Sequence, residues 1–189
     1  MTSSEKPAAK KRLVRLLLIA LMAAVICVCA WITVPSPVPF TLQTFAVFLT
    51  ALLLGGCDGT AAVFLYICIG AAGVPVFSGF KGGVGVLAGP TGGYIVGFLA
   101  IPLLYWLVSR FSKSRLAAAL SLAGGLLLCY LAGTVWFLFA TDGWHAENGI
   151  GNALLLCVVP FLLPDAVKLA LALFVGDRIN RIRAKSGRT

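Results

Sequence analysis

Two charged side chains, Asp165 and Lys168, interrupt the apolar stretch PFLLPDAVKLALALF at residues 160–174. A spacing of three residues puts them on one face of a helix, where they can pair. A lone charge at the centre of a bilayer costs about 2.5–3.5 kcal/mol on insertion scales, and pairing lowers that cost without explaining why the charges are there. We expect the pair to hold a polar ligand. The alternatives are a structural ion pair, or Lys168 extending to the membrane interface.

A second polar group follows three prolines in VPSPVPFTLQTF, residues 34–45. Thr41, Gln43 and Thr44 open an apolar segment there. The amide of Gln43 offers both donors and an acceptor. Of these, Thr41 and Gln43 are candidate ligand contacts. The alternatives are a helix cap for Thr41 and an exposed interfacial position for Gln43.

The third candidate is the glycine-rich stretch GVPVFSGFKGGVGVLAGPTGGY at residues 73–94, whose one charge is Lys81. Its GVGVLA matches G-x-G-x-x-A, but no βαβ unit surrounds it, so a dinucleotide site is excluded. Glycine amides approach a ligand closely and glycines can act as hinges. We expect an outer loop that closes over a ligand. The alternative is a flexible connector, which the embedded apolar residues disfavour.

Enzyme and metal-site signatures are missing from the sequence. It contains no H-E-x-x-H, no G-x-S-x-G and no Walker lysine, and its one histidine, His145, has no evident nucleophile beside it. The six cysteines lie in or beside apolar segments without C-x-x-C spacing. We therefore expect no catalysis, no metal and no cofactor.

The composition indicates a membrane protein. The 189 residues are 60% hydrophobic and 11% charged, and the mean hydropathy is +1.03. A soluble domain has about a quarter charged residues. We predict one all-α integral membrane domain at residues 13–176, between basic cytoplasmic tails at 1–12 and 177–189.

The positions of the charges predict the orientation and exclude a nucleic-acid partner despite the net charge of +9. Every Lys and Arg except Lys81 and Lys168 lies in 6–15, 110–115 or 178–188. Such segments favour the cytoplasmic side. Residues 141–149 lack Lys and Arg and are expected outside.

Hydropathy predicts the spans, each needing about 20 apolar residues. Four segments fit, namely 13–33, 92–108, 116–140 and 151–175. Residues 41–73 divide at GGCDG (55–59) into two shorter pieces. We predict six transmembrane helices, with the glycine-rich outer loop between the third and fourth. The alternative is four spans plus a re-entrant hairpin.

The N-terminus imitates a signal peptide, but its apolar run is long and more spans follow, so it is kept as the first helix.

Ala20 and Ala24 lie one turn apart on the first helix, a small-xxx-small spacing that lets helices approach closely. Spacing alone favours packing within the protein over docking of a partner.

Three blocks together resemble the BioY family of biotin-specific substrate-binding (S) components of energy-coupling factor (ECF) transporters. They are VPFTLQTFAVFLTALLLG (38–55), GVPVFSGFKGGVGVLAGPTGGYIVGFL (73–99) and PDAVKLALA (164–172). The resemblance extends over about residues 13–176. It implies six helices in the bacterial plasma membrane, cytoplasmic termini, and biotin uptake energised by a membrane coupling subunit and two cytosolic ATPase subunits.

The resemblance also implies residue roles. The family's P-D-x-x-K signature falls on Asp165 and Lys168, so Asp165 would accept from a ureido N–H of biotin while Lys168 donates to the carbonyl or steadies Asp165. Its A-x-x-x-A docking motif for the coupling subunit falls on Ala20 and Ala24.

Other contacts with biotin are our expectations from residue chemistry. Thr41 and Gln43 are polar contacts. The apolar walls are expected from Phe77, Tyr94, Val76 and Trp136. The carboxylate is expected at Lys81 and the amides of Gly82 and Gly83, with help from a helix N-terminus near Thr91. Two other functions stay open: an S component for another vitamin or a biotin precursor, and a membrane scaffold.

Overall fold

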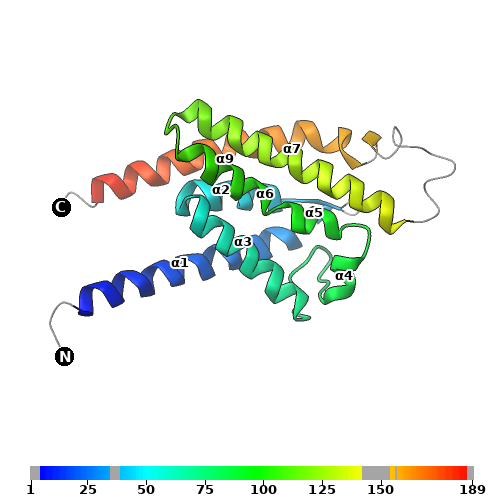
Figure 1. The fold of residues 1–189 in the computed structure, drawn as a ribbon, viewed down its shortest axis with the longest axis horizontal. Coiled ribbons are helices and arrows are strands. Elements are labelled where there is room, and N and C mark those ends of the chain that lie inside the picture. Colours follow the sequence, from blue (N-terminus) through cyan, green and yellow to red (C-terminus); the bar gives the residue numbers. More distant parts are fainter. Residues whose placement is uncertain (1–4, 35–38, 142–153, 156, 187–189) are drawn as a thin grey trace.

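The computed structural model describes residues 5–34, 39–141, 154–155 and 157–186, and these are mostly helical (Figure 1). In chain order the elements are α1 (Glu5–Trp31), β1 (Thr33–Val34), β2 (Phe40–Thr41), α2 (Gln43–Leu54), α3 (Gly56–Ala71), α4 (Val84–Ala88), α5 (Gly92–Gly97), α6 (Ala100–Ser109), α7 (Arg115–Ala140) and α9 (Val159–Ser186). The strands β1 and β2 form a short antiparallel pair in which Thr33 lies opposite Thr41.

Within the described residues, four helical segments are long and apolar enough to cross a membrane: Ala9–Trp31, Gly92–Ser109, Arg115–Ala140 and Val159–Ser186. The second of these combines α5 and α6. The helices α2 and α3 are apolar but shorter, with 12 and 16 residues. The protein is therefore a multi-pass membrane protein by length and composition.

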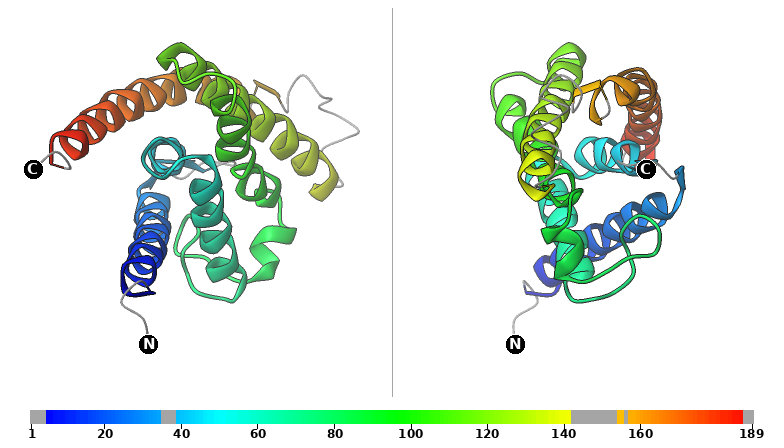
Figure 2. Two further views of the ribbon diagram at one scale, coloured as in Figure 1. Left: turned by 60° about the vertical axis from the view of Figure 1, so that its left-hand side comes forward. Right: turned by 90° about the vertical axis from the view of Figure 1, so that its right-hand side faces the viewer.

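The helices pack in two groups. The helices α5 and α6 lie against α7, while α2 packs between α9 and the pair formed by α1 and α3. Figure 1 shows α1 and α9 extending from the same end of the molecule, and the turned views of Figure 2 agree. Between the groups, α3 contacts α6 so closely that a Cβ on Gly56 would lie 2.3 Å from the Cα of Trp106. Glycine at this position allows the two backbones to meet.

The glycine-rich stretch between α3 and α5 is folded against its surroundings. Phe77 and Lys81 form an isolated antiparallel bridge, and the Gly83 N–H donates to the Gly70 carbonyl at 2.7 Å. At the end of α1 the Trp31 ring stacks on Phe80 with centroids 5.2 Å apart, and its indole N–H donates to the Pro75 carbonyl at 2.9 Å. This stretch includes α4, so it is more ordered than an open loop.

Several helices extend beyond the expected spans or divide them. Helix α1 begins at Glu5 rather than at residue 13, and α9 continues to Ser186 instead of ending near 175. Most of both basic tails is thus helical, because polar residues continue a helix beyond the apolar span. The expected span 92–108 is divided between α5 and α6. Of the expected outer segment 141–149, residues 142–149, including His145, lie outside the described part.

Polar contacts that the sequence did not suggest hold the turn between α2 and α3. The Arg15 Nε donates to both oxygens of Asp58, at 2.9 and 2.8 Å. From the other side, Asn180 and Arg183 of α9 donate to the carbonyls of Leu52 and Leu53. These bonds satisfy carbonyls that the last turn of a helix leaves without intrahelical partners. Both long helices are therefore fixed to this turn.

Candidate ligand-binding site

The Asp165 carboxylate lies inside the helix bundle, with 1% of the residue exposed. Its Oδ1 accepts from the Lys168 Nζ at 2.7 Å and from the Thr44 hydroxyl at 2.8 Å. Its Oδ2 accepts from the Tyr130 hydroxyl at 2.6 Å. The hydrogen-bond donors to this one carboxylate therefore come from three helices, α2, α7 and α9. This is how a buried carboxylate is stabilised in an apolar environment.

Lys168 is also buried, at 5% exposure. Besides Asp165, its Nζ donates to the Thr41 carbonyl at 2.6 Å, and it lies 4.0 Å from the centroid of the Phe40 ring. An ammonium has three N–H donors, so hydrogen bonds to protein use two of them. The lysine does not extend to an interface, which contradicts the snorkelling alternative.

A second polar chain begins at Thr41. The Gln43 side-chain amide donates to the Tyr66 hydroxyl at 2.7 Å and its oxygen accepts from the Thr41 hydroxyl at 3.1 Å. The Gln43 N–H also donates to the same hydroxyl at 3.3 Å, but the N-cap position of α2 is Leu42, so Thr41 is not the capping residue. Gln43 is 4% exposed, so it is not a surface residue.

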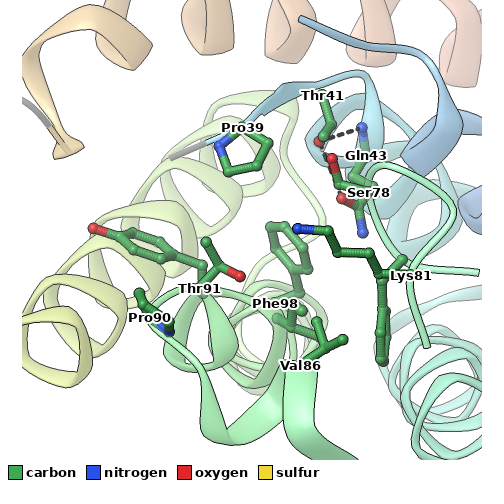
Figure 3. Close-up of a pocket in the computed structure, with 12 residues that line it drawn as sticks. Pro39, Thr41, Gln43, Ser78, Lys81, Val86, Pro90, Thr91 and Phe98 are labelled. Carbon is green, nitrogen blue, oxygen red and sulfur yellow. Dashed lines mark hydrogen bonds between the residues drawn. The ribbon is translucent and has the colours of Figure 1, made fainter. Parts of the chain in front are cut away.

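Two adjoining cavities meet at these polar groups. The larger holds about 300 Å³ and is lined by residues from β2, α2, the glycine-rich stretch and α5; they are Pro39, Thr41, Gln43, Phe77, Ser78, Lys81, Val86, Pro90, Thr91, Tyr94, Ile95 and Phe98. Figure 3 shows the Lys81 side chain extended across it, with Thr41 and Gln43 on one side and Pro90 and Thr91 on the other.

The smaller cavity holds about 50 Å³ and contains the buried charges. Asp165, Lys168, Thr44 and Tyr130 line it together with apolar side chains of α5, α7 and α9. The two cavities share four lining residues, Pro39, Thr41, Tyr94 and Phe98. A ligand with a small polar head and a longer tail fits this shape, with the head at the charges and the tail in the larger cavity.

Most of the predicted site residues gather at these cavities. Thr41, Gln43, Phe77, Lys81 and Tyr94 line the larger cavity, and Asp165 and Lys168 line the smaller. Thr91 also lines the larger one.

Four predicted contacts lie elsewhere. Gly82 and Gly83 line neither cavity, and the Gly83 N–H is already bonded to Gly70. The contact of these two amides with a ligand therefore stays a prediction that the cavity lining does not support. Val76 is buried outside both cavities, and Trp136 donates instead to the Gly89 carbonyl.

The predicted docking residues Ala20 and Ala24 are exposed on α1. Their neighbours on the same helix, including Leu17 and Leu21, are 59% and 57% exposed. This face does not pack inside the protein, in contrast to what spacing alone favoured.

Among the residues of the site that were not predicted, three stand out. Tyr130 binds the carboxylate from α7, Phe40 covers the ammonium, and Phe98 lines both cavities. No pattern in the sequence singles out Tyr130, because an isolated tyrosine in an apolar helix is common. Thr44 was noticed as a polar residue but not assigned to the pair.

The fold and the site together define a class: a multi-pass α-helical membrane protein with an internal cavity lined by a buried ion pair. The BioY family model matches residues 2–185. The chain belongs to the BioY family.

Relatives with assigned names support the same family. The "Biotin transporter BioY" of Thermotoga maritima is 38% identical over 166 residues, covering 87% of this chain and 95% of that protein. The "Probable biotin transporter BioY" of Pyrococcus horikoshii is 39% identical over 164 residues, covering 86% and 94%. The crystal structure of the S-component for biotin from an ECF-type ABC transporter superposes with a TM-score of 0.79 at 24% identity, covering 96% of this chain and 95% of that one. This last likeness concerns the fold.

Proposed function

We propose that the chain is a biotin-binding S component, which captures biotin and carries it through the membrane with separate energising subunits. The family is one of transporters and not of enzymes. The observation that carries the proposal is the buried Asp165–Lys168 pair in a cavity joined to a larger one.

The ureido ring of biotin fits the chemistry of the smaller cavity. A ureido group presents two N–H donors and one carbonyl acceptor. Asp165 accepts from one N–H, and the remaining N–H of Lys168 donates to the carbonyl. Because both charges are already paired and 1% and 5% exposed, binding there requires little further desolvation. Charge-assisted hydrogen bonds of this kind contribute about 1.5–3 kcal/mol each.

The rest of the molecule fits the larger cavity. Phe77 and Tyr94 provide apolar walls for the thioether ring, with Thr41 and Gln43 as polar contacts beside it. Lys81, whose side chain extends across the cavity (Figure 3), is the cation for the valerate carboxylate. The proposed site does not include Gly82 and Gly83, because neither of them lines a cavity.

Membrane topology and partners complete the proposal. The short helices α2 and α3 bring the number of crossings to six, with both termini in the cytoplasm, as the basic residues near α1 and at the end of α9 favour. A membrane coupling subunit docks on the exposed Ala20–Ala24 face, and two cytosolic ATPase subunits supply the energy.

Calorimetric titration of the purified full-length protein in detergent tests the proposal. We expect tight binding of biotin. A hundredfold excess over the dissociation constant should stabilise the protein by about 2.7 kcal/mol, which raises the melting temperature. A panel with dethiobiotin and unrelated vitamins separates the alternatives. Preference for another ligand would contradict biotin as substrate, and no response to any ligand would favour a scaffold.

A further inference from the structure

The two oxygens of Asp165 are not equivalent. Each carboxylate oxygen has two lone pairs that can accept hydrogen bonds. On Oδ1 both are occupied, by Lys168 and Thr44. Among the described residues, Oδ2 accepts only from Tyr130, at 2.6 Å. One acceptor position, on Oδ2, is therefore left for a ligand.

Tyr130 is well placed to fix that position. Its side chain comes from α7, whereas the carboxylate is on α9, so the bond joins two helices at the site. Tyr130 is 6% exposed and lines the same small cavity as Asp165. A phenol has a single O–H, and here the O–H is used on Oδ2. Its hydrogen bond also withdraws negative charge from the oxygen that faces the ligand.

We propose that Tyr130 is a positioning residue that sets ligand specificity by leaving Asp165 one open lone pair, so that the site prefers a neutral cyclic urea, which directs one of its two N–H groups at Oδ2, over a cation that directs several. This deepens the proposed function and rests on it. Tyr130 acts through Asp165.

The substitution Tyr130→Phe removes the hydroxyl and keeps the ring that fills the core. Biotin directs only one N–H group at Oδ2, so it cannot use the second lone pair that the missing hydroxyl frees. It also loses the orienting effect of Tyr130 on its acceptor, Oδ2. 2-Iminobiotin carries the same tail, but its guanidine is protonated at neutral pH and has a positively charged NH2 group in place of the carbonyl oxygen, which adds two N–H donors. The variant should therefore tolerate iminobiotin better, relative to biotin, than the unmodified protein does.

The experiment is a titration of the full-length protein with biotin and with 2-iminobiotin at pH 7.5. In Tyr130→Phe we expect the ratio of affinities, biotin over iminobiotin, to fall about tenfold, the value of one charge-assisted hydrogen bond. Because both ligands share the carboxylate tail, contacts at Lys81 cancel in this ratio. Equal weakening of both ligands, or an unchanged ratio, would overturn the proposal and leave Tyr130 a structural residue.

Two matched variants complete the design. Thr44→Val removes the hydroxyl donor of the other oxygen and should weaken both ligands by the same factor, since Oδ1 stays bonded to Lys168; a tenfold change in the ratio would overturn the assignment of Oδ2. Tyr105→Phe removes a tyrosine hydroxyl of α6 that lines a separate cavity, and should change neither affinity.

If the unmodified protein did not bind biotin, the proposed function itself would fail. Normal biotin binding with an unshifted ratio would refute the specificity role alone.

Discussion

Replacement of Asp165 by asparagine should weaken biotin binding strongly and destabilise the protein as well. The new side chain keeps the shape but loses the charge that Lys168, Thr44 and Tyr130 all donate to. Loss of a charge-assisted hydrogen bond to the ligand is worth about 1.5–3 kcal/mol, which corresponds to roughly a tenfold to hundredfold higher dissociation constant.

The effect on stability follows from the partner left behind. Lys168 is 5% exposed, and a buried charge without its counter-ion costs about 3–5 kcal/mol. Replacing both members of such a pair by uncharged residues is often neutral for stability. The double variant Asp165→Asn/Lys168→Met should therefore regain most of the melting temperature lost in the single variant, but it should not regain biotin binding.

Thermal unfolding in detergent and calorimetric titration measure the two effects separately. Asp177→Asn is the matched control, since Asp177 lies further along α9 and pairs with Arg115 at 3.2 Å, with 42% of the Asp177 side chain exposed. An exposed pair contributes about 0–1 kcal/mol, so this control should bind biotin normally. The reasoning would be refuted if the double variant bound biotin like the unmodified protein, or if it remained as unstable as the single variant.

Three further predictions concern other parts of the molecule. Lys81→Ala should weaken biotin more than biotin amide in competition binding, and equal losses would exclude a carboxylate contact. Ala24→Trp should leave biotin binding of the isolated protein intact and abolish energised uptake by cells, whereas surviving uptake would show that this face does not dock. Gly56→Ala places a methyl group against the Trp106 backbone and should destabilise the protein by about 1–3 kcal/mol in thermal unfolding. Its control, Gly85→Ala, adds a methyl group in open space, and a comparable loss there would contradict the packing argument.

The helices were predictable from the sequence to the extent that lipid imposes a length on an apolar segment. The apolar stretches correspond to α1, α2, α3, α7, α9 and the combined α5 and α6. Hydropathy marks the part of a helix inside hydrocarbon, so it gave neither the beginning of α1 at Glu5 nor the end of α9 at Ser186. Hydropathy also did not predict the break between α5 and α6, since the apolar run continues through Phe98 and Leu99.

In the candidate site, the buried pair could be predicted because the chemistry of its side chains conflicts with their apolar environment. Asp165 and Lys168 stood out because charges are rare in apolar helices, and the structure brings them together at a cavity. Tyr130 could not be found this way, since its role depends on the packing of α7 against α9. The hydrogen bond from the Gly83 N–H to the Gly70 carbonyl could not be predicted either, because a sequence does not show which backbone groups pair across a loop.

A high-resolution structure of the protein with biotin bound tests the central claim most directly. It should place a ureido N–H within about 2.7–3.2 Å of the Asp165 carboxylate, with Lys168 directed at the ureido carbonyl. A bound biotin whose ureido ring lies away from both charges, with Asp165 and Lys168 bonded only to each other and to their present protein partners, would contradict the account.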